Sequence, residues 1–356
     1  MRKLIKRSFS MKRLSTILLL LAFSCSAICQ PFTMNVGGTL ITRYNYTSDA
    51  YPSNTFNIRM ARLSLSGRVM DEFAYNVLLQ MEGTPAKALE ASVEWQRFSG
   101  FRIKLGQFKI PFTFESPISA IDQGFYQRGM TSYKLGGYND RVGQQSSTGR
   151  DIGLMFQGDL FEMDGRGLLH YMVGIFNGQG INVPDVNGGK DIVGGFWLSP
   201  VAHMRIGAFG WKGVYGRVYE GAYAQVDRIR YALSFDYTPG DWTIRSEYVH
   251  NHGMAFKNPY GGNLDIDTVL GDKADAWYAL MIAPLKPGKL HAKLRYDVYR
   301  DNGAWDRAYN AYDFGFDYCF SRNLKFSAVG SLVNDRRLSA GSHNYFMFDF
   351  QMGLRF

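Results

Sequence analysis

The chain has 356 residues, of which 20% are charged and 15% are aromatic, with 39 Gly and 11 Pro. Such aromatic content excludes a disordered chain, and beyond residue 30 no apolar run reaches the roughly 18 residues of a transmembrane helix. The formal net charge of +9 is concentrated at the start, because residues 1–29 hold six Lys and Arg residues and no acid. The other 34 basic residues face 31 acidic ones, a balance of +3, so the charge does not indicate a nucleic-acid-binding protein.

Residues 1–29 form a predicted signal peptide. A basic opening precedes the apolar run Ile17–Phe23 and a stretch of small residues, which are the three parts of a secretory signal. We expect cleavage after Cys29 and a single mature domain of residues 30–356, with Met11 as an alternative start of translation. The mature chain then has one cysteine and no disulfide, so an extensive hydrogen-bonded framework must stabilise it.

Alternating apolar and polar residues predict β-strands along the whole mature chain. Ile229, Tyr231 and Leu233, for example, alternate with Arg228 and Arg230, and a period of two places the two kinds on opposite faces of a sheet. We predict sixteen strands, near residues 34–44, 56–68, 73–82, 87–97, 101–109, 150–158, 168–176, 190–198, 203–211, 220–237, 241–250, 274–283, 290–300, 309–319, 323–333 and 343–356.

The lengths of these strands and of their connections favour a transmembrane antiparallel β-barrel. Strands of about ten residues suffice to cross a bilayer at a tilt, and an even number closes without an open edge. Several even-numbered connections are tight turns, such as Ser99–Gly100, whereas the odd ones at 45–55, 110–149, 177–189, 251–273 and 334–342 are long. A short link near Gly83–Pro85 departs from this alternation. Short turns on one side and long loops on the other are typical of outer-membrane barrels, with both termini on the short-turn side.

The C-terminal segment has the clearest alternation, from Phe346 to the final Phe356. Six apolar residues at every second position give one continuous apolar face. A chain that ends on an aromatic residue resembles the C-terminal signal of bacterial outer-membrane barrels. We therefore expect Phe356 to be recognised by the barrel-assembly machinery.

Four segments resemble, in order and spacing, landmarks of the phosphate-selective porin O and P family: Phe56–Gly67, Leu105–Phe112, Gly149–Gly153 and Phe176–Gly178. The resemblance extends over nearly the whole mature chain. It implies a sixteen-stranded barrel of the bacterial outer membrane, usually a homotrimer, with basic lumen residues that bind anions. It also implies that the long third loop, here about residues 110–149, folds into the lumen as a constriction. The alternative for this loop is a mobile extracellular segment.

Basic side chains on the predicted lumen faces are the candidates for anion binding. Arg suits phosphate because its planar guanidinium donates two hydrogen bonds at once. Arg59 and Arg62 are three residues apart, so a bulge near Met60–Ala61 is needed for both to face the lumen. The candidates are Arg59, Arg62, Lys109, Arg128, Arg150, Arg228, Arg230, Arg245, Lys293 and Arg295.

Acids on the same faces leave an alternative open. If the arginines pair with them, the protein is a general mixed-charge porin without anion selectivity; these acids are Glu82, Glu90, Glu94, Asp151, Asp236, Glu247, Asp297, Asp313 and Asp317. A secreted, soluble β-sheet protein that binds carbohydrate would explain the signal and the strands, but not the terminal Phe or the alternating connections. An outer-membrane barrel enzyme is the remaining alternative.

The sequence offers no catalytic motif of the common hydrolase, metalloprotease or nucleotide-binding types. His250 and His252 share a strand face without a third metal ligand at a suitable spacing. We therefore predict no enzyme activity, no metal and no cofactor. The predicted function is passive diffusion of small hydrophilic solutes and ions across the outer membrane, with some preference for anions such as phosphate.

Overall fold

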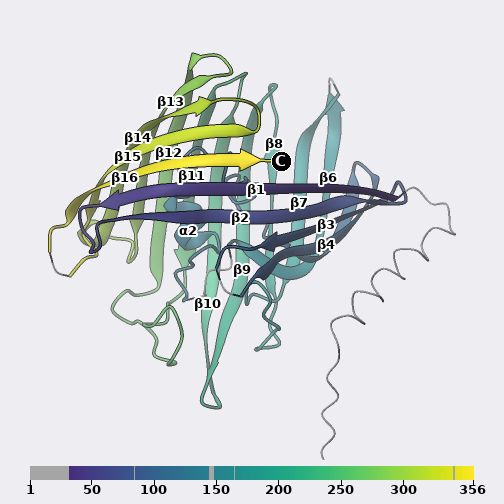
Figure 1. Cartoon of the computed structure of the whole chain (residues 1–356). Helices are drawn as coiled ribbons and strands as arrows, with labels where there is room; N and C mark the ends of the chain where they lie inside the picture. The colour runs from purple at the N-terminus through teal and green to yellow at the C-terminus, as the bar shows by residue number, and fades with distance from the viewer. Residues whose placement is uncertain (1–31, 84, 144–147, 164, 340) are drawn as a thin grey trace, which may run out of the picture.

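The computed structural model describes residues 32–83, 85–143, 148–163, 165–339 and 341–356. The predicted signal peptide, residues 1–29, lies outside these ranges. The described residues form sixteen strands: β1 (Phe32–Thr47), β2 (Asn54–Val69), β3 (Phe73–Gln80), β4 (Lys87–Phe98), β5 (Phe101–Lys109), β6 (Arg150–Met163), β7 (Arg166–Phe176), β8 (Asp191–Leu198), β9 (Met204–Tyr219), β10 (Ala222–Tyr237), β11 (Thr243–His252), β12 (Lys273–Lys286), β13 (Leu290–Arg300), β14 (Ala308–Cys319), β15 (Leu324–Asp335) and β16 (Asn344–Arg355). Each pairs with its neighbours in sequence, and β1 pairs with β16. The predicted sixteen-stranded antiparallel barrel is confirmed (Figure 1).

The two ends of the chain close the barrel. Strands β1 and β16 are antiparallel, with Thr39 opposite Arg355 and Thr47 opposite Met347. Beyond the last paired residue, the amide of Gly38 donates a hydrogen bond of 2.8 Å to the carbonyl of Phe356. Closure matters because a bilayer offers no hydrogen-bonding partner to an unpaired strand edge.

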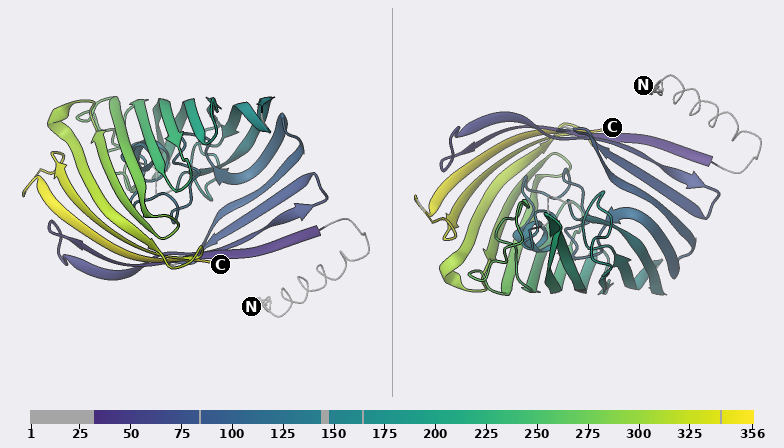
Figure 2. Two further views of the ribbon diagram at one scale, coloured as in Figure 1. Left: turned by 90° about the horizontal axis from the view of Figure 1, so that it is seen from above. Right: turned by 90° about the horizontal axis from the view of Figure 1, so that it is seen from below.

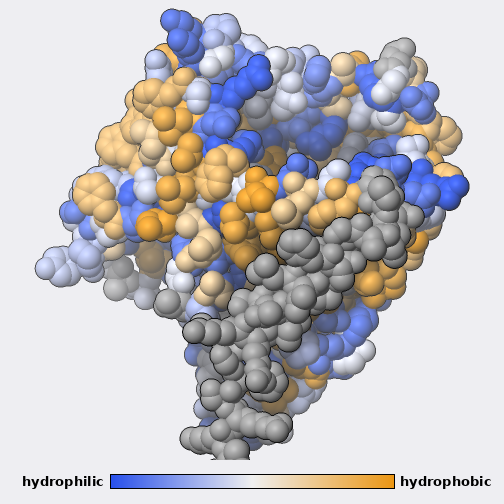
Figure 3. Space-filling view, turned by 45° about the vertical axis from the view of Figure 1, so that its right-hand side comes forward, coloured by the Kyte–Doolittle hydropathy of each residue, from blue (hydrophilic) through white to orange (hydrophobic). Residues whose placement is uncertain are grey.

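The barrel is inside out compared with a soluble protein. On β10, Arg228 and Arg230 are 0% and 2% exposed on the inner face, whereas Tyr231 and Leu233 are 51% and 57% exposed on the outer face. The space-filling view shows apolar surface over the outer wall and hydrophilic surface at the rim (Figure 3). An apolar exterior over strands of this length suits contact with lipid.

The ninth strand is longer than predicted. We expected it to end at residue 211, but β9 continues to Tyr219 and pairs with β10 throughout, up to Tyr219 opposite Ala222. Gly213 interrupts the alternation in this extension because there is no room for a side chain at its position. A Cβ atom on Gly213 would lie 1.8 Å from the carboxylate of Asp191. The connection from β9 to β10 is therefore short. At the same end of the barrel, several connections are long as predicted, including that between β11 and β12.

In the described part of the chain, helical structure is limited to short segments in connections between strands, α2 (Met130–Leu135) and a 3-10 turn, η2 (Trp305–Arg307). Among the described residues, no helix is both long and apolar enough to cross a membrane. Helix α2 belongs to the connection between β5 and β6, and both end-on views show this connection within the ring of strands (Figure 2).

A glycine in the middle of β5 allows two strands to approach closely. Gly106 has a φ of +127°, and a Cβ atom there would lie 2.2 Å from the carbonyl oxygen of Ala91. We predict that Gly106→Ala destabilises the barrel by about 1–3 kcal/mol, because it adds backbone strain and a clash. The measurement is the urea midpoint of the refolded barrel in detergent.

Gly210 provides the matched control, because it lies in the middle of β9 and a Cβ atom there would meet no atom within 4 Å. We expect Gly210→Ala to unfold at the wild-type midpoint. Equal midpoints for the Gly106→Ala and wild-type proteins would contradict the prediction.

Candidate functional site

Carboxylates of the barrel wall hold the backbone of the β5–β6 connection, of which residues 110–143 are described and which we call the inner loop. One carboxylate oxygen of Glu247 on β11 accepts hydrogen bonds from the amides of Phe114 and Glu115, at 2.6 and 2.8 Å. Asp297 on β13 accepts from the amide of Met130 at 3.1 Å. These bonds to two neighbouring parts of the wall fix the path of the loop inside the barrel.

The inner loop also packs its aromatic side chains against the same side of the barrel. The ring of Phe112 lies 5.5 Å from that of Trp211, and Phe114 lies 5.6 Å from Trp197 and 5.5 Å from Phe209. These residues belong to a buried apolar cluster in which the loop meets the inner faces of several strands. Part of the barrel interior is therefore a packed core and not open lumen.

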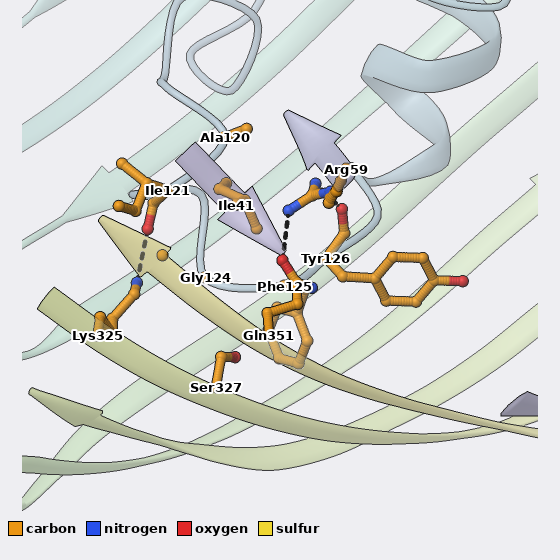
Figure 4. A pocket seen from close by; sticks show the side chains of 11 residues that line it. Ile41, Arg59, Ala120, Ile121, Gly124, Phe125, Tyr126, Lys325, Ser327 and Gln351 are labelled. Carbon is orange, nitrogen blue, oxygen red and sulfur yellow. Dashed lines mark hydrogen bonds between the residues drawn. The ribbon is translucent and has the colours of Figure 1, made fainter. Parts of the chain in front are cut away.

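Two basic side chains hold the middle of the loop from another side. Arg59 donates hydrogen bonds to the carbonyl of Tyr126 and, at 2.8 Å, to Gln351. Lys325 on β15 donates to the carbonyl of Ile121 at 2.6 Å (Figure 4). Hydrogen bonds from charged groups are stronger than those between neutral groups, so these contacts reinforce the loop where it crosses the barrel.

Half of the candidate basic residues form ion pairs with aspartates. All five lie on β10, β11 or β13, and each ion pair is 3.0 Å or shorter: Arg228 with Asp191, Arg230 with Asp140, Arg245 with Asp236, Lys293 with Asp317 and Arg295 with Asp313. Buried charges that are paired in this way cost less to keep away from water. These five residues have the arrangement expected in a mixed-charge porin.

The pair between Arg230 and Asp140 joins the wall to the end of the inner loop. Both guanidinium NH2 groups of Arg230 donate to the Asp140 carboxylate at 2.7 Å, and one also donates to the carbonyl of Leu135 at 2.7 Å. Burial by itself would raise the pKa of Asp140, but the charge of Arg230 holds that pKa below its usual range.

Three of the other five candidates line a small cavity, which we call the basic cavity. Its volume is about 140 Å³, and its lining includes Arg62, Lys109, Arg150 and one acid, Glu90. Arg150 donates to Glu90 at 2.6 and 2.9 Å, whereas Lys109 donates to the neutral carbonyl of Pro117 at 2.9 Å. The Nε atom of Arg62 is buried without a hydrogen-bond partner among the described residues.

A β-bulge turns both arginines of β2 toward the interior. The pairing of β1 with β2 shifts between Ile41 opposite Met60 and Thr42 opposite Ile58, which leaves Arg59 as the extra residue. We expected such a bulge one or two residues further along. Because of the shift, Arg59 reaches the inner loop and Arg62 lines the basic cavity.

Arg128 is next to the basic cavity but not in its lining. It is 8% exposed, donates to the carbonyls of Glu115 and Ile118, and lies 4.3 Å from the centre of the Tyr138 ring. In this structure Arg128 organises the inner loop, which differs from the direct contact with solute that we expected.

Sequence reasoning did not find how the wall acids are used. Glu247 and Asp297 were recognised as acids on lumen faces, and the structure shows that they bind backbone amides of the loop. The alternation of Glu247 and Asp297 with apolar residues indicated that both acids lie on the lumen face. An alternating sequence does not indicate whether such a side chain contacts a loop that is distant in sequence. The same holds for Asp140, which lies in the loop itself.

Comparison with known families supports the resemblance. The family model described as phosphate-selective porin O and P matches residues 40–167, which include β2 to β6 and most of the residues of the basic cavity. The resemblance is thus confirmed for this part of the chain. The search of curated proteins found no match in sequence.

Solved structures with the same fold include outer-membrane proteins, among them a porin and a channel. An anion-selective porin from Comamonas acidovorans is 14% identical, with a TM-score of 0.63 over 92% of this chain and 100% of that one. The outer membrane channel DcaP of Acinetobacter baumannii is 12% identical, with a TM-score of 0.61 over 91% and 97%. A trimer form of OmpT from Vibrio cholerae is 15% identical, with a TM-score of 0.59 over 92% and 100%.

The family match, the fold and the apolar outer wall lead to the same conclusion. The chain is a β-barrel of the bacterial outer membrane with the architecture of a porin channel, and this architecture indicates a channel and not an enzyme.

The ion pair between Arg230 and Asp140 allows a test of how firmly the inner loop is held. Arg230→Ala leaves a buried carboxylate without its partner, so we predict a loss of about 3–5 kcal/mol in stability. We also expect larger and noisier single-channel currents, because the end of the loop is released. Unfolding in detergent and planar-bilayer recordings measure the two effects.

The control is the double variant Arg230→Met with Asp140→Asn, which removes both charges together. It should lose much less stability than Arg230→Ala, because no unpaired charge stays buried. Wild-type conductance and noise in the Arg230→Ala protein would show that this contact does not restrain the loop.

Proposed function

We propose that this porin allows passive diffusion of small hydrophilic solutes and ions with a preference for anions, and that the basic cavity is where the preference arises. One observation carries the proposal: three basic side chains and one acid line this cavity, whereas five of the other seven basic candidates each have an aspartate partner. The excess of positive charge is thus concentrated at one place beside the inner loop.

Electrostatics explains why this excess would select anions. The sign of the charge at the narrowest part of a pore sets its ion preference, and charges act more strongly where little water screens them. Glu90 compensates Arg150, which leaves the charges of Arg62 and Lys109 without a carboxylate in direct contact. An anion that enters the cavity meets both.

The lining also offers donors suited to phosphate. The hydroxyl groups of Thr39, Ser64 and Ser119 lie in the same cavity as Arg62 and Lys109. A phosphate group accepts several hydrogen bonds at once, and Arg donates in pairs. The family match and the anion-selective porin of the same fold support anions as the solutes.

Further parts of the proposal concern assembly. The inner loop would be the constriction, because it occupies the barrel interior next to the basic cavity. A homotrimer is supported by the trimer form of an outer membrane protein with the same fold. We also propose that Phe356, which is 61% exposed at the end of the closing strand, is recognised by the barrel-assembly machinery.

A general mixed-charge porin is the second candidate. The five ion pairs on β10, β11 and β13 favour it, because each of these basic side chains has an aspartate partner. The two candidates differ in their ion preference.

The reversal potential under a salt gradient distinguishes them. In planar bilayers, we predict an anion-selective potential for the purified protein. The double variant Arg62→Gln with Lys109→Gln should lower the chloride-over-potassium permeability ratio about threefold or more, because it removes the two uncompensated charges.

Lys212→Gln is the matched control, because Lys212 is exposed on β9 and alternates with the inward-facing Trp211. Removing its charge should leave the potential at the wild-type value. A wild-type protein without anion preference, or a double variant with the wild-type potential, would favour the mixed-charge porin.

Phosphate binding predicts block of the chloride current. Added phosphate should reduce the current through the wild-type channel in a concentration-dependent way, and Arg62→Gln should raise the half-blocking concentration about fivefold, because it removes a charged donor. Sulfate at the same ionic strength tests whether the site prefers phosphate. If phosphate has no effect beyond its ionic strength, the cavity is an anion filter without a phosphate site.

A further inference from the structure

A second and larger cavity lies at the long-loop mouth of the barrel, and we call it the vestibule. Its volume is about 1100 Å³. Its walls come from the start of β4, the connection between β7 and β8, the end of β9 and the connection between β11 and β12. Unlike the basic cavity, it is large enough for an organic molecule.

The vestibule has mostly apolar walls. Ile181, Val183, Val186, Val218, Tyr215 and Tyr260 all line it. Val183 and Val186 are each 38% exposed, and Tyr260 is 72% exposed. Exposing apolar side chains to water is unfavourable in free energy. A concentration of them in a cavity is typical of a binding surface for an apolar group.

The charges of the vestibule have one sign. Lys87 and Arg217 line it, and no acid does so among the described residues. Arg217 donates to the carbonyls of Asn258 and Gly143 at 2.8 and 2.9 Å and forms no ion pair with a carboxylate of the described residues. Asp185 lies between two of the lining residues in sequence, but its carboxylate is bonded to Lys190.

A polar donor in the vestibule has no partner. Gln179 is 6% exposed, and its side-chain Nε2 makes no hydrogen bond with any described residue. A buried amide without a partner is costly, and a ligand oxygen would remove that cost. Nε2 is itself buried, so a ligand oxygen forms this bond only when the Gln179 side chain turns toward the vestibule.

The vestibule adjoins the basic cavity along β4. Ala88 lines the vestibule, and Glu90, two residues further on, lines the basic cavity. Two residues of a strand span about 7 Å. The linings of the two cavities therefore come within about 7 Å of each other along β4.

We infer that the vestibule binds organic anions with an apolar body, such as aromatic or branched carboxylates, and delivers them to the basic cavity. The apolar walls hold the body, and Gln179 with the nearby cations receives the carboxylate. This inference rests on the proposed anion preference and specifies which anions the channel takes up.

The test compares benzoate with acetate as blockers of the chloride current in planar bilayers, each added from the long-loop side of the purified full-length protein. The two anions carry the same charge and differ in the apolar ring. We expect a half-blocking concentration about tenfold lower for benzoate. Benzyl alcohol, which has the ring without the charge, should not block.

Two variants locate the effect. Tyr260→Ser should raise the half-blocking concentration of benzoate about threefold and leave that of acetate unchanged, because it removes part of the apolar wall. Gln179→Leu should raise it by a similar factor, because it removes the hydrogen-bond donor. Tyr51→Ser is the matched control, because Tyr51 is 100% exposed on a different connection.

Equal block by benzoate and acetate overturns the inference, and so does wild-type benzoate block in both variants. Either result leaves the anion preference of the channel intact. Loss of anion preference in the reversal potential would instead overturn the proposed function, so the two failures are distinguishable.

Discussion

The attachment of the inner loop to one wall of the barrel determines where a solute can pass. A sixteen-stranded barrel is wide enough to enclose an aqueous channel, but here Phe112 and Phe114 pack against β8 and β9 inside it. Glu247 and Asp297 then fix the loop backbone against β11 and β13. The side formed by β7 to β14 is filled, and the basic cavity is left beside β1 to β6.

This division of the interior also divides the charges. Where the loop is packed, a charge is removed from water and must be paired, as Arg228 and Arg230 are with aspartates. Beside the basic cavity, Arg62 and Lys109 are only partly buried, and neither forms an ion pair with a described residue. Burial under the packed loop thus explains why Arg228 and Arg230 have aspartate partners. The more exposed Arg62 and Lys109 occur in a similar sequence pattern but have no such partner.

The alternation of residue types was sufficient to predict the sixteen strands and to separate their two faces, because both follow from a local period of two. Which face is inside had to be inferred from the lengths of the strands and of their connections. The alternation did not predict the second half of β9, where it is broken by Gly213. A side chain at that position would clash with Asp191 of the neighbouring strand β8. The alternation could not assign partners either. Arg230 and Asp140 are 90 residues apart, and they meet only because the loop returns to the wall. Contacts of this kind depend on the packed loop, which no local pattern encodes.

The single acid of the basic cavity has a physical role in transport. A channel must bind its solute well enough to attract it and weakly enough to release it. Three uncompensated cations around 140 Å³ would hold an anion strongly. Glu90, bonded to Arg150, removes one of these charges and keeps that guanidinium from binding the solute fully. The apolar vestibule adds attraction through many weak contacts, which are individually easy to break. Weak binding of the solute in the vestibule and a reduced positive charge in the basic cavity are both compatible with rapid passage of the solute.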